Sequence, residues 1–305
     1  MKSPLSQRGS MSAPPVSPAC FAQAFEDALF LPFNRTSLAG RFELAAAPAP
    51  VIEGGVWLVL QGAQLYLTAA GDLPDELQPP ATAECCLCGW WQQRPCALCR
   101  WPQEASPPVG LVGYNLQAEE PGISLALLSL AALGRQLLHW LDNSRCCSAC
   151  GTPLQALARS WGRRCSGCAR EHYPHIHPCI IVLVQRGEQV LLTRKAGWKA
   201  GRYSLVAGFV DVGECLEETV VREVREETGI AITNLRYVGS QGWPFPSQLM
   251  VGFTADYAGG DIQVEEAELE DARWFSCHDL PLLPGRRSIS RFLIDRHLKQ
   301  LGVLP

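Results

Sequence analysis

The chain has 305 residues, of which 47% are hydrophobic and 18% are charged, and its formal net charge at pH 7 is −4. This composition excludes an intrinsically disordered chain, and the net negative charge argues against general binding of nucleic acids or anionic membranes. The length predicts about two domains.

The first half of the chain begins with a segment unlike the rest. Residues 1–20 are rich in Ser and Pro and lack the apolar region of a secretory signal, so we expect a disordered tail on a cytoplasmic protein. Residues 21–122 hold short strand-like runs such as VWLVL at 56–60. The longest apolar run, within 123–143, has only about a dozen residues before Arg135, whereas a membrane span needs roughly 20. It predicts a buried helix and no membrane segment.

Within the first half, Cys85-x-x-Cys88 and Cys96-x-x-Cys99 form a pair of motifs separated by a short gap. Two interpretations stay open for them. They are either a second metal site or two strands joined by a turn at 92–93, in which each cysteine acts as a small hydrophobic residue. The short gap favours the hairpin.

A second pair of Cys-x-x-Cys motifs lies between the two halves of the chain. The sequence contains 14 cysteines and no export signal, and in a reducing compartment such spacing indicates metal binding rather than disulfides. Cys147, Cys150, Cys165 and Cys168 therefore predict one closed, tetrahedral Zn²⁺ site with a structural role. The alternative is a set of four buried or redox-active cysteines.

From residue 177 onward the pattern is that of a layered α/β domain. PCIIVLV and VLLTR flank the turn RGEQ and predict a hairpin. Further strands and two helices follow, with the helices at 215–228 and 287–301. Strands around one or two helices predict an α/β (α+β) domain with an α/β/α arrangement.

The first of these helices ends in REVREETG, in which acids crowd one side. Val221, Val224 and Thr228 share one face at about 100° per residue. The opposite face carries three glutamates, Glu223, Glu226 and Glu227. Like charges at such spacing each destabilise a helix by about 0.2–0.5 kcal/mol, so the sequence implies either a tolerant solvated surface or a bound cation.

The wider window GFVDVGECLEETVVREVREETGI (208–230) resembles the Nudix box, GX5EX7REUXEEXGU, at every defined position. The resemblance implies hydrolysis of a nucleoside diphosphate with Mg²⁺ or Mn²⁺. Oxygen ligands on one helical face suit these hard cations and substrate phosphates. It further implies that the three glutamates bind metal, that Arg222 orients a carboxylate, and that Gly208 permits a close backbone approach. Gly229 is expected to supply a left-handed cap.

Three features around the box resemble the NADH pyrophosphatase family, also known as NAD-capped RNA hydrolases. They are the cysteine ribbon, the linker YPHIHPCIIV (173–182) and the motif SQGWPFPSQLM (240–250). The resemblance implies an N-terminal Nudix-like mixed α/β domain at 21–143, a zinc ribbon at 144–176 and a catalytic Nudix sandwich at 177–305. It also implies a homodimer that hydrolyses NAD(H) to AMP and nicotinamide mononucleotide and removes NAD caps from RNA.

Carried over residue by residue, the family's catalytic groups fall on Arg222, Glu223, Glu226, Glu227 and Glu268, with Glu268 as a further metal ligand or catalytic acid. The substrate contacts fall on Tyr173, Phe209, Gln241, Gly242, Trp243, Pro244, Phe245, Pro246, Ser247, Gln248 and Ser290, with Gln241 as the expected polar contact. Neither proline donates to a strand ladder, so 244–246 is predicted to be a turn.

The chain departs from the family motif twice, because Gly242 replaces a proline and Gln248 stands where a serine is usual. These departures keep another nucleoside diphosphate, such as ADP-ribose, open as the substrate. A third alternative is a non-catalytic zinc-ribbon protein that senses a nucleotide or RNA, although that reading predicts lost box acids and none is lost.

Overall fold

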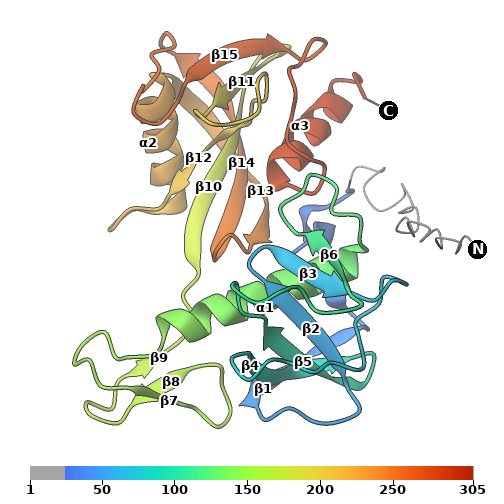
Figure 1. Ribbon diagram of the computed structural model, residues 1–305. Helices are drawn as coiled ribbons and strands as arrows, with labels where there is room; N and C mark the ends of the chain where they lie inside the picture. The colour runs from blue at the N-terminus through green and yellow to red at the C-terminus, as the bar shows by residue number, and fades with distance from the viewer. Residues whose placement is uncertain (1–24, 305) are drawn as a thin grey trace, which may run out of the picture.

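The computed structural model describes residues 25–304, which form three sheets and three α-helices, together with short 3-10 helices (Figure 1). The tail predicted at 1–20 lies outside the described residues. Within 25–304, no helix is both long and apolar enough to cross a membrane. The domain boundaries assigned from the sequence stay predictions.

The N-terminal sheet has the strand order β1-β4-β5-β2-β3-β6 and packs against helix α1 (Leu125–Asn143). Its strands are β1 (Phe42–Ala49), β2 (Val56–Gln61), β3 (Gln64–Leu67), β4 (Glu84–Trp91), β5 (Arg94–Arg100) and β6 (Val112–Asn115). Helix α1 approaches the sheet closely at Gly134, where an added Cβ would lie 2.7 Å from the Leu58 side chain. The prediction of a buried helix at 123–143 is confirmed.

The cysteines of the N-terminal sheet lie on the hairpin of β4 and β5, which turns at Gln92 and Gln93 with positive φ angles of 49° and 66°. Residues three apart on a strand point to opposite faces. Cys85 and Cys99 accordingly pack on one face of the sheet, whereas Cys88 and Cys96 pack on the other. The hairpin interpretation is confirmed, and the four sulfurs do not surround a common point.

A small three-stranded sheet follows α1 and carries the other two Cys-x-x-Cys motifs. It consists of β7 (Leu154–Ala156), β8 (Arg163–Cys165) and β9 (Glu171–His172), in that order. In Figure 1 it lies at the lower left, away from the C-terminal sheet, and the linker after β9 runs up into β10.

The C-terminal sheet has the order β13-β14-β10-β11-β15, with β12 paired to β10. Strands β10 and β14 are parallel, and the other pairs are antiparallel. The strands are β10 (His177–Arg186), β11 (Gln189–Arg194), β12 (Val206–Phe209), β13 (Ala231–Trp243), β14 (Gln248–Gly259) and β15 (Asp271–Ser276).

Two helices cover the two faces of this sheet, which explains why β10 is apolar at successive positions. Ile180 packs with Val224 of α2 (Leu216–Thr228). The next residue, Ile181, packs on the opposite face with Leu293 of α3 (Ile289–Gln300). A strand covered on both faces has no solvent side and no alternating polar pattern. The α/β/α sandwich is confirmed.

The first described residues connect the two large sheets. Ala28 and Leu31 pack into the core beneath α3, although the chain then continues into the N-terminal sheet. The side chain of Asn34 accepts a hydrogen bond from the backbone N–H of Gly242 at 2.9 Å, and the N–H of Phe33 donates to Ser129 of α1. Segment 28–34 therefore ties β13 to α1.

Candidate functional site

Three carboxylates converge where α2 faces the loop before β15. Oxygens of Glu223, Glu227 and Glu268 lie within 4.8 Å of one another. Glu223 and Glu227 are one helical turn apart and are 8% and 2% exposed. Acids this close repel one another in their charged forms, and hard divalent cations relieve that repulsion by accepting oxygen ligands.

Burial makes this cluster electrostatically unusual. It raises the pKa of Glu227 to about 7 and also raises the pKa of Glu223. Among the described residues, neither carboxylate oxygen of Glu227 has a hydrogen-bond partner. A buried carboxylate that accepts no hydrogen bond is costly. This set of oxygen donors fits a divalent metal, to which the carboxylates would donate their unused lone pairs.

Arg222 organises the acids around the cluster. Its Nη1 donates to Glu223 at 2.9 Å and to Glu226 at 3.0 Å, and its Nε and Nη2 donate to Glu214 at 2.5 and 2.8 Å. Arg222 lowers the pKa of Glu214 to about 2, so that this pair is charged at neutral pH. The planar guanidinium thereby fixes the orientation of the Glu223 carboxylate.

Gly208 lets strand β12 pass directly against the cluster. A Cβ at this position would overlap the carboxylate of Glu223. At the other end of the box, Gly229 has a φ of 72° and caps α2 by donating its N–H to the carbonyl of Arg225. These two positions require glycine for different reasons, namely space at one and the left-handed conformation at the other.

Glu226 is separate from the other two glutamates of the helix. Its side chain is 60% exposed, it pairs with Arg222, and it lies outside the carboxylate cluster. The predicted apolar face was also shifted by one residue, because Val220 is buried with Val224, whereas Val221 is exposed. In this structure Glu226 therefore lies apart from the other two glutamates, and its role as a metal ligand stays a prediction.

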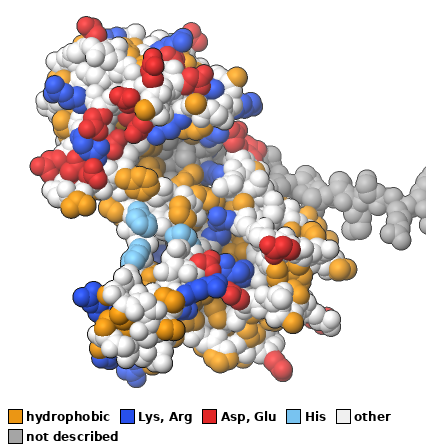
Figure 2. All heavy atoms as spheres, turned by 60° about the vertical axis from the view of Figure 1, so that its left-hand side comes forward, with side chains coloured by type: hydrophobic (Ala, Val, Ile, Leu, Met, Phe, Trp, Pro, Cys, Tyr) orange, Lys and Arg blue, Asp and Glu red, His pale blue; other side chains and the backbone are white. Residues whose placement is uncertain are grey.

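A pocket of about 430 Å³ opens beside the cluster. It is lined by Glu223, Glu268 and Arg222 together with Phe209 and Gln248, two of the predicted substrate contacts. We call it the acid pocket. Phe209 is half exposed, as an aromatic side chain available to a ring would be. Acidic side chains gather on this lobe of the molecule in Figure 2, which shows a hollow between it and the lower lobe.

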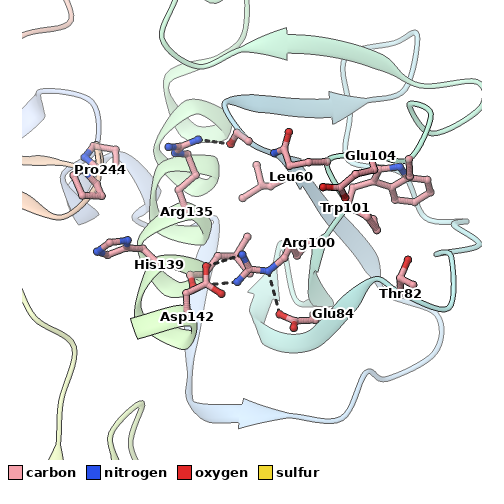
Figure 3. Close-up of a pocket in the computed structure, with 16 residues that line it drawn as sticks. Leu60, Thr82, Glu84, Arg100, Trp101, Glu104, Arg135, His139, Asp142 and Pro244 are labelled. Atoms are coloured by element: carbon pink, nitrogen blue, oxygen red, sulfur yellow. Dashed lines mark hydrogen bonds and ion pairs between the residues drawn. The ribbon is translucent and has the colours of Figure 1, made fainter. Parts of the chain in front are cut away.

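The aromatic motif lies elsewhere, at the junction of the two large sheets. Residues 244–247 form the turn between β13 and β14, as predicted. Trp243 and Phe245 contact each other and Phe33 edge to face, with ring centroids 5.4–6.0 Å apart. Figure 3 shows Pro244 facing α1, where a cavity of about 780 Å³ is also lined by Arg135. Of the motif's residues, Gln248 and Met250 reach the acid pocket.

Gln241 was expected to be the polar contact to the substrate, and the structure gives it a different role. It is fully buried, and its amide nitrogen donates to the carbonyls of Pro32 and Arg287 at 2.9 and 2.8 Å. Its amide oxygen accepts from the N–H of Ile289 at 2.8 Å. The whole amide is engaged in joining β13 to segment 28–34 and α3, so it is not available to a ligand.

Three other predicted contacts are likewise engaged away from the acid pocket. Ser247 is paired with the ring of His177 at 2.9 Å. Ser290 is buried and shares a hydrogen bond with Ser204 at 2.8 Å. Tyr173 is exposed in the linker, where its hydroxyl donates to Glu171 and its ring covers Gly162. The single chain therefore brings Phe209 and Gln248 to the acid pocket and leaves the rest of the list outside it.

The four cysteines of the small sheet come together as predicted from their spacing. The sulfurs of Cys147, Cys150, Cys165 and Cys168 lie within 4.8 Å of one another, with Cys147 and Cys168 at 3.6 Å and Cys150 and Cys165 at 3.4 Å. Four thiolates around one point suit Zn²⁺. This group is distant in the fold from the acid pocket and offers no oxygen ligand.

Sequence reasoning missed Lys195, which lies at the edge of the acid pocket with its Nζ 3.6 Å from Glu227. It also gave no role to Glu214, although the box pattern contains that position. The signal for Glu214 was present, since it is the first glutamate of the box pattern. Lys195 follows a strand and has no local signal.

Comparison with known proteins identifies the domain and its relatives. The NUDIX domain model matches residues 175–295. A protein from Pseudomonas putida (strain W619) named NAD-capped RNA hydrolase NudC is 42% identical over 210 residues, covering 65% of this chain and 76% of the relative. A protein of the same name from Pseudomonas aeruginosa (strain LESB58) is 45% identical over 202 residues, covering 61% and 72%.

Proposed function

This chain belongs to the NAD-capped RNA hydrolase family of Nudix hydrolases, and we propose that it cleaves the diphosphate of NAD(H) into AMP and nicotinamide mononucleotide. Water adds to one phosphorus while the bridging P–O bond breaks and the second phosphate leaves. On RNA that carries an NAD cap, the same cleavage leaves a 5′-monophosphate.

The observation that carries the proposal is the cluster of Glu223, Glu227 and Glu268, in which Glu223 and Glu227 are buried and Glu227 accepts no hydrogen bond from the described residues. These three residues would hold Mg²⁺ or Mn²⁺, which polarises phosphoryl oxygens and lowers the pKa of an attacking water. Arg222 holds Glu223 in position, and the exposed ring of Phe209 offers a surface on which a base or nicotinamide can stack.

For the second metal, we propose one structural Zn²⁺ per chain on the four ribbon cysteines. A closed site of four thiolates leaves no position for water, so it supports the fold rather than the reaction. The homodimer and the cytoplasmic location stay predictions. So do the substrate contacts predicted for Tyr173 and for residues 242–247.

A substrate comparison tests the proposal. Purified protein with Mg²⁺ is given NADH, ADP-ribose and a short NAD-capped RNA, and the products are separated by chromatography. We expect AMP with reduced nicotinamide mononucleotide from NADH, and 5′-monophosphate RNA from the capped transcript. Absence of both products would contradict the proposed substrate.

ADP-ribose is the second candidate, because Gln248, one of the two departures from the family motif, lines the acid pocket. Cleavage of ADP-ribose without cleavage of NADH would keep the reaction and change the substrate. A glutamine side chain is longer than that of serine and carries its donor and its acceptor on separate atoms, so it would contact a substrate differently.

A further inference from the structure

Lys195 follows β11 directly, and its backbone is held in a turn built around the side chain of Arg194. The guanidinium of Arg194 donates to the carbonyls of Lys199, Trp198 and Arg202 at 2.6, 2.8 and 3.2 Å. Three such bonds from one planar group fix the turn, so the position from which the Lys195 side chain starts is well defined.

The ammonium of Lys195 forms a loose ion pair with Glu227, the acid of the cluster that accepts no hydrogen bond from the described residues. Its Nζ lies 3.6 Å from Oε1 of Glu227, which is beyond hydrogen-bond length. The Lys195 side chain is 40% exposed, whereas that of Glu227 is 2% exposed. The lysine therefore supplies a compensating charge to the buried acid but retains a solvent-facing path along which its flexible stem can move.

Lys195 is also the available cation of the acid pocket. The other cation that lines the pocket, Arg222, is bound to Glu214, Glu223 and Glu226. In the part of the chain that the structure describes, the Lys195 side chain forms its ion pair with Glu227. A diphosphate that enters this pocket passes acids on one side and meets one cation that is not otherwise engaged.

We propose that Lys195 is an exchangeable counter-ion, which neutralises Glu227 in the metal-free protein and binds a non-bridging oxygen of the substrate's diphosphate once Glu227 is a metal ligand. The inference rests on the proposed function, because it takes a diphosphate as the ligand of the pocket. Two cations competing for one carboxylate repel each other over about 4 Å, and the exposed, flexible lysine is the one that can leave.

This exchange makes Lys195 act in opposite directions on two affinities. Its charge competes with a divalent cation for Glu227, so it weakens metal binding in the absence of substrate. The same charge strengthens the binding of a diphosphate. A residue that only supports the fold would lower both affinities or neither when it is replaced.

The test uses the full chain and Lys195→Met, which keeps the length of the stem and removes the charge. Binding of Mn²⁺ without substrate is measured by electron paramagnetic resonance of the free ion. We expect the variant to bind Mn²⁺ roughly 3- to 10-fold more tightly than the wild type, a modest effect because the lysine is partly exposed. Lys199→Met, an exposed lysine of the same turn, is the matched control and should not change Mn²⁺ affinity.

The second half of the test measures binding of a methylene-bridged NAD analogue, which cannot be hydrolysed, at saturating Mn²⁺. We expect Lys195→Met to weaken this binding about tenfold and Lys195→Arg to restore most of it, since the guanidinium also binds phosphate. Unchanged or weaker Mn²⁺ binding by Lys195→Met, or unchanged binding of the analogue, would overturn the exchange. Failure of the wild type to hydrolyse NADH would instead contradict the proposed function, and the substrate-free Mn²⁺ titration would still report on Lys195.

Discussion

Replacing Gly208 with alanine tests whether the box glycine exists to make room for a metal ligand. The new Cβ would overlap the Glu223 carboxylate, whereas non-bonded carbon atoms stay about 3.5–4.0 Å apart. The carboxylate must therefore move by more than about 1 Å, away from its 2.9 Å bond to Arg222. A displacement of that size in a reacting group costs about 100-fold in rate.

The expected result for Gly208→Ala is a fall of about 100-fold in kcat/KM for NADH. The extra buried methyl group should also lower the unfolding free energy by about 1–3 kcal/mol. Steady-state AMP formation and thermal unfolding measure the two. Gly285→Ala is the control, because its Cβ would meet its nearest neighbour, the carbonyl of Glu119, at an ordinary 3.4 Å.

A double-mutant cycle shows whether the effect passes through Glu223. In a Glu223→Ala background there is no carboxylate to displace, so adding Gly208→Ala should cost less than about threefold more. If the two losses multiply in full, or if Gly208→Ala keeps wild-type kcat/KM, the steric explanation is wrong.

Three further predictions concern groups outside the acid pocket. Gln241→Ala should lower the unfolding free energy by about 2–4 kcal/mol, because it removes buried hydrogen bonds, among them the two that the amide nitrogen donates. A rise in KM for NADH without any loss of stability would contradict this structural role. Burial lowers the pKa of His297. Below the usual pKa of about 6.5 the unfolded chain therefore binds a proton that the native state does not bind, and the native state loses stability as the pH decreases. His297→Leu should flatten the decline in melting temperature between pH 7 and 5, and equal slopes would refute this. Cys150→Ser should reduce bound zinc from one per chain to near zero by elemental analysis and lower the melting temperature, whereas Cys88→Ser should leave the zinc content at one.

Much of the acid pocket could be predicted because its parts are local in the sequence. Gly208, Arg222, Glu223 and Glu227 lie in one strand, loop and helix, and helical spacing alone sets two of the acids one turn apart. The layered sheet was predictable for a similar reason, since each element carries its own periodicity. The error at Val221 shows the limit, because two adjacent valines, Val220 and Val221, leave the buried face to be decided by packing against the sheet.

The surroundings of the predicted substrate contacts could not be predicted in the same way, because they depend on tertiary contacts. Gln241 binds the carbonyl of Pro32, which lies 209 positions away in the chain. Nothing in the sequence near residue 28 indicates that Ala28 packs under α3. A motif identifies the residues that a family shares, but the surrounding packing decides which of their polar atoms remain free.

The most direct test of the central claim compares two adjacent acids of α2. Formation of AMP and reduced nicotinamide mononucleotide from NADH is measured at saturating Mg²⁺ for the wild type, Glu227→Gln and Glu226→Gln. Glu227 is buried in the cluster, and Glu226 is exposed outside it. We expect Glu227→Gln to lose at least about 100-fold in kcat/KM and Glu226→Gln to lose less than about tenfold. Equal losses, or turnover retained by Glu227→Gln, would contradict the assignment of the catalytic metal site to Glu223, Glu227 and Glu268.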